Sequence, residues 1–246
     1  MDYFGDEPDM SGIAQALFMA AAGINFVGSF YQDGSGASST TITANYGGSL
    51  SGGSDSSPRE GDYVFVAVCA SNSSDLTFSA STAGYTKVTD LYANNTGTTS
   101  DCSMAVFYKR MGASPDSAVT INSSAAAFMI ATVYVVRGMN ASTPMDVTAT
   151  TATTVTNGSI PNPPAITPVT AGAAVLAVGG AAGTGTMTDL TSSDLSNFDS
   201  RNTGFAATGM GLIYNWTSGA VDPAAFGGGG AATRATASVT MALRPA

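Results

Sequence analysis

The chain has 246 residues, of which 44% are hydrophobic and only 10% are charged. This apolar content excludes a disordered chain, and the length suits one large all-β domain. The net charge is −9, the eight Lys and Arg residues are scattered, and there is no histidine. Nucleic-acid binding needs concentrated basic residues, and histidine is the commonest general base and metal ligand. We therefore expect no enzyme activity, no nucleic-acid partner, no cofactor and no metal site.

Residues 1–32 begin with an acidic tip and continue, from Met10 to Gln32, without any charge. Acidic residues at the start argue against a signal peptide, and the polar residues and missing basic flanks argue against a membrane span. The apolar side chains do not form one stripe, so they need burial on every side. We expect this arm to dock on sister subunits or on a larger shell through Ile13, Leu17, Phe18, Met19, Ile24, Phe26, Val27 and Phe30. The alternative is a helix packed under the chain's own strands.

Residues 33–59 are rich in Gly, Ser and Thr, which predicts a linker with a short strand over 40–46. Residues 60–246 contain repeated β-type runs separated by turn residues, without an amphipathic helix between them. This pattern is typical of an antiparallel β-sandwich or a jelly-roll-like fold. The expected strands cover residues 62–70, 85–92, 102–110, 117–121, 128–137, 173–179, 208–216 and 235–243.

Few residues suggest chemistry. Cys69 and Cys102 lie in apolar runs and are interpreted as core residues rather than as a disulfide or reactive thiols. The acidic stretch 189–199 lacks the ligand order of a calcium loop, so we expect a solvated loop, with a weak calcium site as the alternative. Tyr214 and Trp216 stand two apart in a predicted strand and so share one face, either in the core or as a stacking platform for glycans.

Five short motifs follow one another after residue 60. They are Gly61-Asp-Tyr-Val-Phe-Val, Gly84-Tyr-Thr-Lys-Val, Val106-Phe-Tyr-Lys-Arg-Met, Val133-Tyr-Val-Val-Arg-Gly-Met-Asn with Thr143-Pro-Met-Asp, and Ser238-Val-Thr-Met-Ala-Leu-Arg-Pro. In this order they resemble the β-sandwich domain of tailed-phage structural proteins, found in head decoration proteins and tail fibres. The resemblance covers residues 60–246 and marks strands and turns, so it transfers no catalytic residue.

The resemblance implies a non-enzymatic virion protein, made in the host cytoplasm and placed on the surface of the phage particle. The first hypothesis is a capsid decoration or cement protein, a homotrimer bound to the major capsid protein or other virion subunits through the arm. The alternative hypothesis is a tail-fibre or receptor-binding module that recognises host surface glycans, with Tyr214 and Trp216 as the platform.

Overall fold

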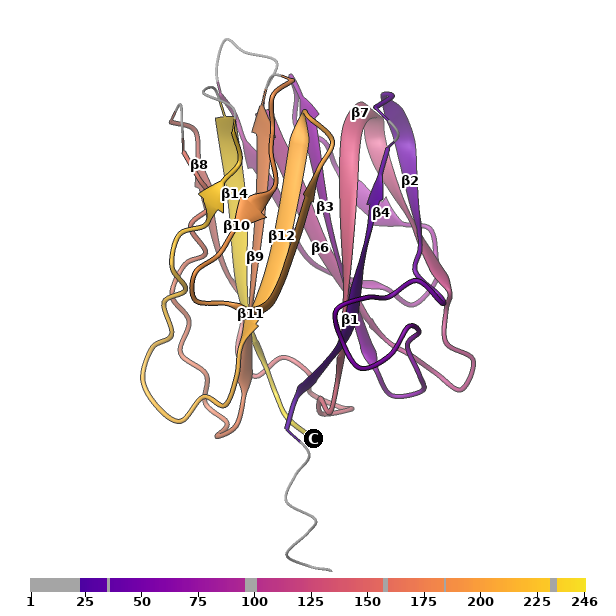
Figure 1. Ribbon diagram of the computed structural model, residues 1–246, viewed down its shortest axis with the longest axis vertical. Helices are drawn as coiled ribbons and strands as arrows, with labels where there is room; N and C mark the ends of the chain where they lie inside the picture. The colour runs from indigo at the N-terminus through magenta and orange to yellow at the C-terminus, as the bar shows by residue number, and fades with distance from the viewer. Residues whose placement is uncertain (1–22, 35, 96–100, 157–158, 184, 231–233) are drawn as a thin grey trace, which may run out of the picture.

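The computed structural model describes residues 23–34, 36–95, 101–156, 159–183, 185–230 and 234–246. These residues form antiparallel β-strands in two large sheets packed face to face, and no helix occurs among them (Figure 1). No helix long and apolar enough to cross a membrane therefore exists in these ranges. The predicted antiparallel β-sandwich is confirmed.

The chain completes the first sheet before it begins the second. The first sheet has the order β1-β7-β3-β6-β5, with β2 and β4 also on β7. Its strands are β1 (Asn25–Asp33), β2 (Ser39–Asn45), β3 (Tyr63–Asn72), β4 (Phe78–Ala80), β5 (Thr86–Ala93), β6 (Asp101–Arg110) and β7 (Ala118–Arg137). The second sheet, of order β11-β12-β9-β14-β8, contains β8 (Thr150–Thr154), β9 (Ala174–Gly183), β11 (Ser196–Asn202), β12 (Ala206–Ile213) and β14 (Arg234–Leu243). A small pair, β10 (Leu190–Thr191) and β13 (Gly227–Gly228), lies beside it.

Strand β7 is 20 residues long and bends, which produces a third layer (Figure 1). Its second half pairs with β1 and β3, and its first half pairs with β2 and β4. The bent half covers the outer face of β3 and β6, because Ile42, Phe78 and Ile121 share a buried cluster with Val66 and Phe107. The first sheet is thus buried on both faces, which explains why β3 is apolar at nearly every position.

The main core lies between the two large sheets. Phe65, Met104 and Tyr134 from the first sheet meet Val178 and Met210 from the second. The outer face of the second sheet is covered as well, by Phe226 and its neighbours. A side chain at Gly179 would lie only 2.5 Å from the Phe226 ring, so a residue without Cβ is needed at that point of β9.

The predicted boundaries at residues 32 and 60 are wrong, because residues 25–34 and 36–59 belong to the sandwich. β1 pairs with β7 along its whole length, and β2 matches the short strand predicted for 40–46. Ile24, Phe26 and Val27, predicted to dock on other subunits, are instead buried within the chain's own fold. Ile24 and Phe26 lie in the main core, whereas Val27 lies in the cluster under the bent half of β7, against which Phe30 also packs. A strand covered on both faces is a continuous apolar run, so its residues alone do not distinguish it from an apolar docking arm. Ile13, Leu17, Phe18 and Met19 lie outside the described residues.

Candidate functional site

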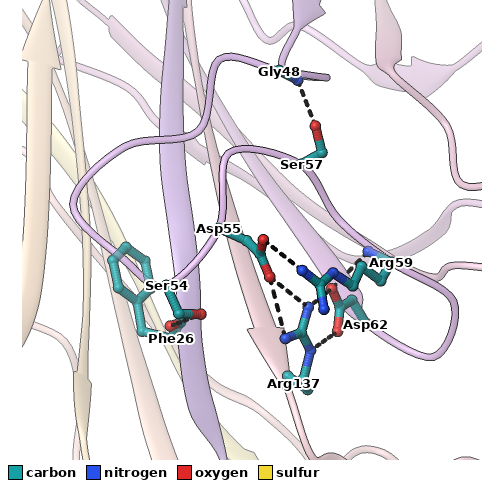
Figure 2. A network of polar contacts seen from close by, with 8 residues as sticks. All are labelled: Phe26, Gly48, Ser54, Asp55, Ser57, Arg59, Asp62 and Arg137. Carbon is teal, nitrogen blue, oxygen red and sulfur yellow. Dashed lines mark hydrogen bonds and ion pairs between the residues drawn. The ribbon is translucent and has the colours of Figure 1, made fainter.

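Two buried aspartates pair with the arginines of the fourth and fifth motifs. Asp62, at the start of β3, is fully buried and accepts two hydrogen bonds from Arg137, at 2.7 Å from Nε and 2.9 Å from Nη2. Asp55 also contacts this guanidinium and forms an ion pair with Arg59 (Figure 2). The hydrogen bonds to Asp62 raise the pKa of Arg137 above its usual value, although burial opposes the change. These residues therefore tie the end of β7 to the loop before β3.

The second aspartate, Asp146, joins the last two motifs. One of its oxygens accepts the backbone N–H groups of Val169 and Thr170, at 2.6 and 2.9 Å, and the other accepts Thr170 Oγ1 and Arg244 Nε. Burial alone would raise the pKa of Asp146, but these hydrogen bonds outweigh it and the pKa is lowered. Gly138, with φ of 87°, begins the turn that brings Asp146 to β14. The aspartates and arginines of the first, fourth and fifth motifs thus act as structural clamps.

Beside the first clamp lies a cleft of about 810 Å³. It is built from four segments: the start of β1, the loop before β3, the bulged edge strand β11 and the residues that follow β12. Arg137 reaches it from the end of β7, and Figure 2 shows Phe26 and Ser54 next to the Asp55 clamp. Its lining consists of Gly23, Ile24, Asn25, Phe26, Gly53, Ser54, Arg137, Asn197, Tyr214 and Asn215.

Two asparagines of this cleft have an unusual backbone. Asn197 and Asn215 have φ of 52° and 57°, and among the described residues they are the non-glycine residues with positive φ. Asn197 is held by two tyrosines: Tyr134 donates to its backbone oxygen at 3.0 Å, and Tyr214 donates to its Oδ1 at 2.7 Å. Burial raises the pKa of Tyr214, so its hydroxyl remains a neutral donor. Asparagine adopts left-handed backbone more readily than most residues, and such residues recur in turns and at functional sites.

No family model, curated protein or solved structure matches this chain. The roles of its residues are therefore argued from their own contacts. By that criterion the cleft is the candidate functional site, because its amides, aromatic rings and guanidinium converge on one space.

Tyr214 and Trp216 do not share the strand face that the sequence predicted. β12 ends at Ile213, and the left-handed Asn215 breaks the alternation of side chains between the two residues. Tyr214 packs against the main core and lines the cleft. Trp216 is outside the cleft lining, and its indole N–H donates to the backbone oxygen of Gly219 at 2.8 Å. Asn197 and Asn215 were not predicted as site residues, because no local sequence pattern predicts a positive φ at asparagine.

The carboxylates of the acidic stretch 189–199 accept hydrogen bonds from different donors and do not converge on one point. Asp189 accepts from Asn202, Asp194 accepts from the backbone of Ala224, and Asp199 accepts from Ser29 of β1. Within the described ranges, no three side chains of the metal-binding types form a group.

The two cysteines are buried free thiols in the main core, as predicted. Their sulfur atoms lie 3.6 Å apart, on neighbouring strands β3 and β6. The hydrogen bond with Cys69, followed by burial, raises the pKa of Cys102 well above its usual value. The Cys102 thiol is therefore kept protonated, and both buried cysteines pack as small apolar groups.

Proposed function

We propose that this protein is a non-enzymatic structural subunit of a phage particle, specifically a decoration or cement protein on the surface of the head. Three facts support this role: the order of the five motifs, the use of their charged residues in clamps rather than at a reactive centre, and the low charge content. The centres of protein interfaces are depleted in charged residues. The partners are the major capsid protein and sister subunits in a trimer.

One observation carries the proposal. The described residues form four buried clusters that pack on both faces of the central strands of the two sheets, and none of these clusters includes a residue of 1–22. The apolar side chains of Ile13, Leu17, Phe18 and Met19 are thus not required for that core. Burying four such side chains yields about 6–12 kcal/mol before the costs of ordering. We propose that they are buried against the shell or a sister subunit.

The test compares the full chain with a chain of residues 23–246 in phage particles that carry either gene. We expect the two proteins to unfold at the same temperature, because the truncation leaves the described core intact. We expect only the full chain to enter particles, at a copy number near that of the major capsid protein. A full-length variant with Leu17→Ser and Phe18→Ser controls for chain length and should also fail to enter.

Two results would count against the proposal. If the truncated chain enters particles normally, residues 1–22 are not the docking segment. If the full chain is present in only a handful of copies at the tail, the tail-fibre alternative replaces the decoration role.

A further inference from the structure

The cleft presents hydrogen-bonding groups that the described part of the chain does not use. Asn197 Oδ1 accepts from Tyr214, but its Nδ2 has no partner among the described residues, and neither has the side chain of Asn215. Both side chains are exposed at the cleft. Because Tyr134 and Tyr214 hold Asn197 in place, its amide is oriented before any ligand arrives.

The charges around the cleft are balanced, which decides the kind of ligand. Arg59 and Arg137 are matched by Asp55 and Asp62 in one network of ion pairs (Figure 2). Four hydrogen bonds from Arg137 to these two aspartates are present, which leaves one of its five N–H groups for another acceptor. An anion would find no excess positive charge here, so the site suits a neutral ligand.

The remaining lining combines rings and polar groups. Phe26 lies against Tyr134 with ring centroids 4.6 Å apart, and Tyr214 packs on the same core, so both rings are rigidly placed. The volume of about 810 Å³ lies within the usual range for sites of small ligands. The free amides and the remaining N–H of Arg137 call for a ligand with several hydroxyl groups. The aromatic rings call for a ligand that also has an apolar face.

We propose that this cleft is a binding site for a neutral saccharide. Its hydroxyl groups bond to the side-chain amides of Asn197 and Asn215 and to the spare N–H of Arg137, and its C–H face lies against Tyr214. The site differs from the Tyr214–Trp216 platform, because Trp216 takes no part in it. It does not depend on whether the chain sits on the head or the tail of a particle.

The experiment uses the full chain and a panel of neutral gluco-, galacto- and manno-configured di- and trisaccharides. Saturation-transfer NMR at millimolar sugar identifies binders, and calorimetry measures their affinity. Uronic-acid and sialylated sugars, and an uncharged extended peptide, are tested in parallel. We expect at least one neutral sugar to bind and the acidic sugars and the peptide not to bind.

Substitution by glycine suits both asparagines, since glycine adopts positive φ freely and the side chain with its amide is removed without backbone strain. Asn197→Gly and Asn215→Gly should each weaken sugar binding by about threefold to tenfold, the effect of one lost hydrogen bond. The exposed Asn215 has no described side-chain partner, so its variant tests the site even if Asn197→Gly fails to fold. Trp216→Phe, outside the cleft, should leave the affinity unchanged. Failure of every neutral sugar to bind, preference for acidic sugars or peptide, or loss of binding only in Trp216→Phe would overturn the proposal.

Discussion

Replacing Asp146 by asparagine tests the clamp between the fourth and fifth motifs. An asparagine oxygen can still accept the backbone N–H groups of Val169 and Thr170, which both bond to the same carboxylate oxygen. The amide nitrogen then takes the place of the oxygen that accepts Arg244 Nε, so two donors face each other. Loss of one hydrogen bond to a charged group costs about 1.5–3 kcal/mol. Arg244 is 31% exposed and can reach water, so we expect about 2–3 kcal/mol of lost stability.

The matching assay is thermal or urea unfolding at pH 7, with Asp189→Asn as the control. The side chain of Asp189 is exposed and bonds only Asn202 among the described residues, so its substitution should change the free energy of unfolding by less than about 0.5 kcal/mol. For Asp146→Asn, a loss of 2–3 kcal/mol corresponds to a melting temperature lower by about 4–12 °C in a domain of this size.

The pH dependence supplies a second check. Because the folded pKa of Asp146 is lowered, its contribution is complete above the unfolded value of 3.8 and is lost as the pH falls through the folded value. The difference between wild type and Asp146→Asn should therefore be constant near neutral pH and shrink below pH 3.8. The reasoning is refuted if Asp146→Asn is as stable as Asp189→Asn, or if the difference persists unchanged in acid.

Two further predictions concern the buried core. Thr132 and Thr208 share a buried hydroxyl–hydroxyl hydrogen bond between the sheets. Thr132→Val should therefore lower the free energy of unfolding by about 1–3 kcal/mol, because the Thr208 hydroxyl loses its partner, and adding Thr208→Val should restore most of that loss. Strictly additive losses in a double-mutant cycle measured by urea unfolding would contradict this. Cys69 and Cys102 should resist a disulfide reagent at pH 8 in the native protein and react fully in denaturant. Burial keeps the reagent from both sulfur atoms, and the raised pKa of Cys102 lowers its thiolate fraction further. Rapid labelling of the native protein would show that the core opens there.

Much of the strand content is predictable from local residues. The run 128–137 is rich in β-branched residues and forms the second half of β7, and the runs that begin at Cys102 and Ala235 become β6 and β14. Such runs specify an extended backbone wherever they lie. The run 24–30 was predicted as part of a docking arm rather than as a strand, because it is apolar on both faces. That pattern follows from the second sheet, which packs on one face of β1, and from the layer formed by the bent half of β7, which packs on the other. Local residues likewise did not show that 117–121 and 128–137 are one bent strand.

The amino-acid sequence by itself determined that the chain is a β protein poor in charge, with two thiols in its core. The tertiary structure decided which residues meet. Asp62 and Arg137 are 75 residues apart, and Asp146 and Arg244 are 98 apart, so their pairing depends on strand register and not on spacing along the chain. The cleft arises in the same way, from five separate segments of the chain that include two left-handed asparagines. Periodicity specifies the conformation of a segment, whereas contacts between segments follow from how the whole core packs.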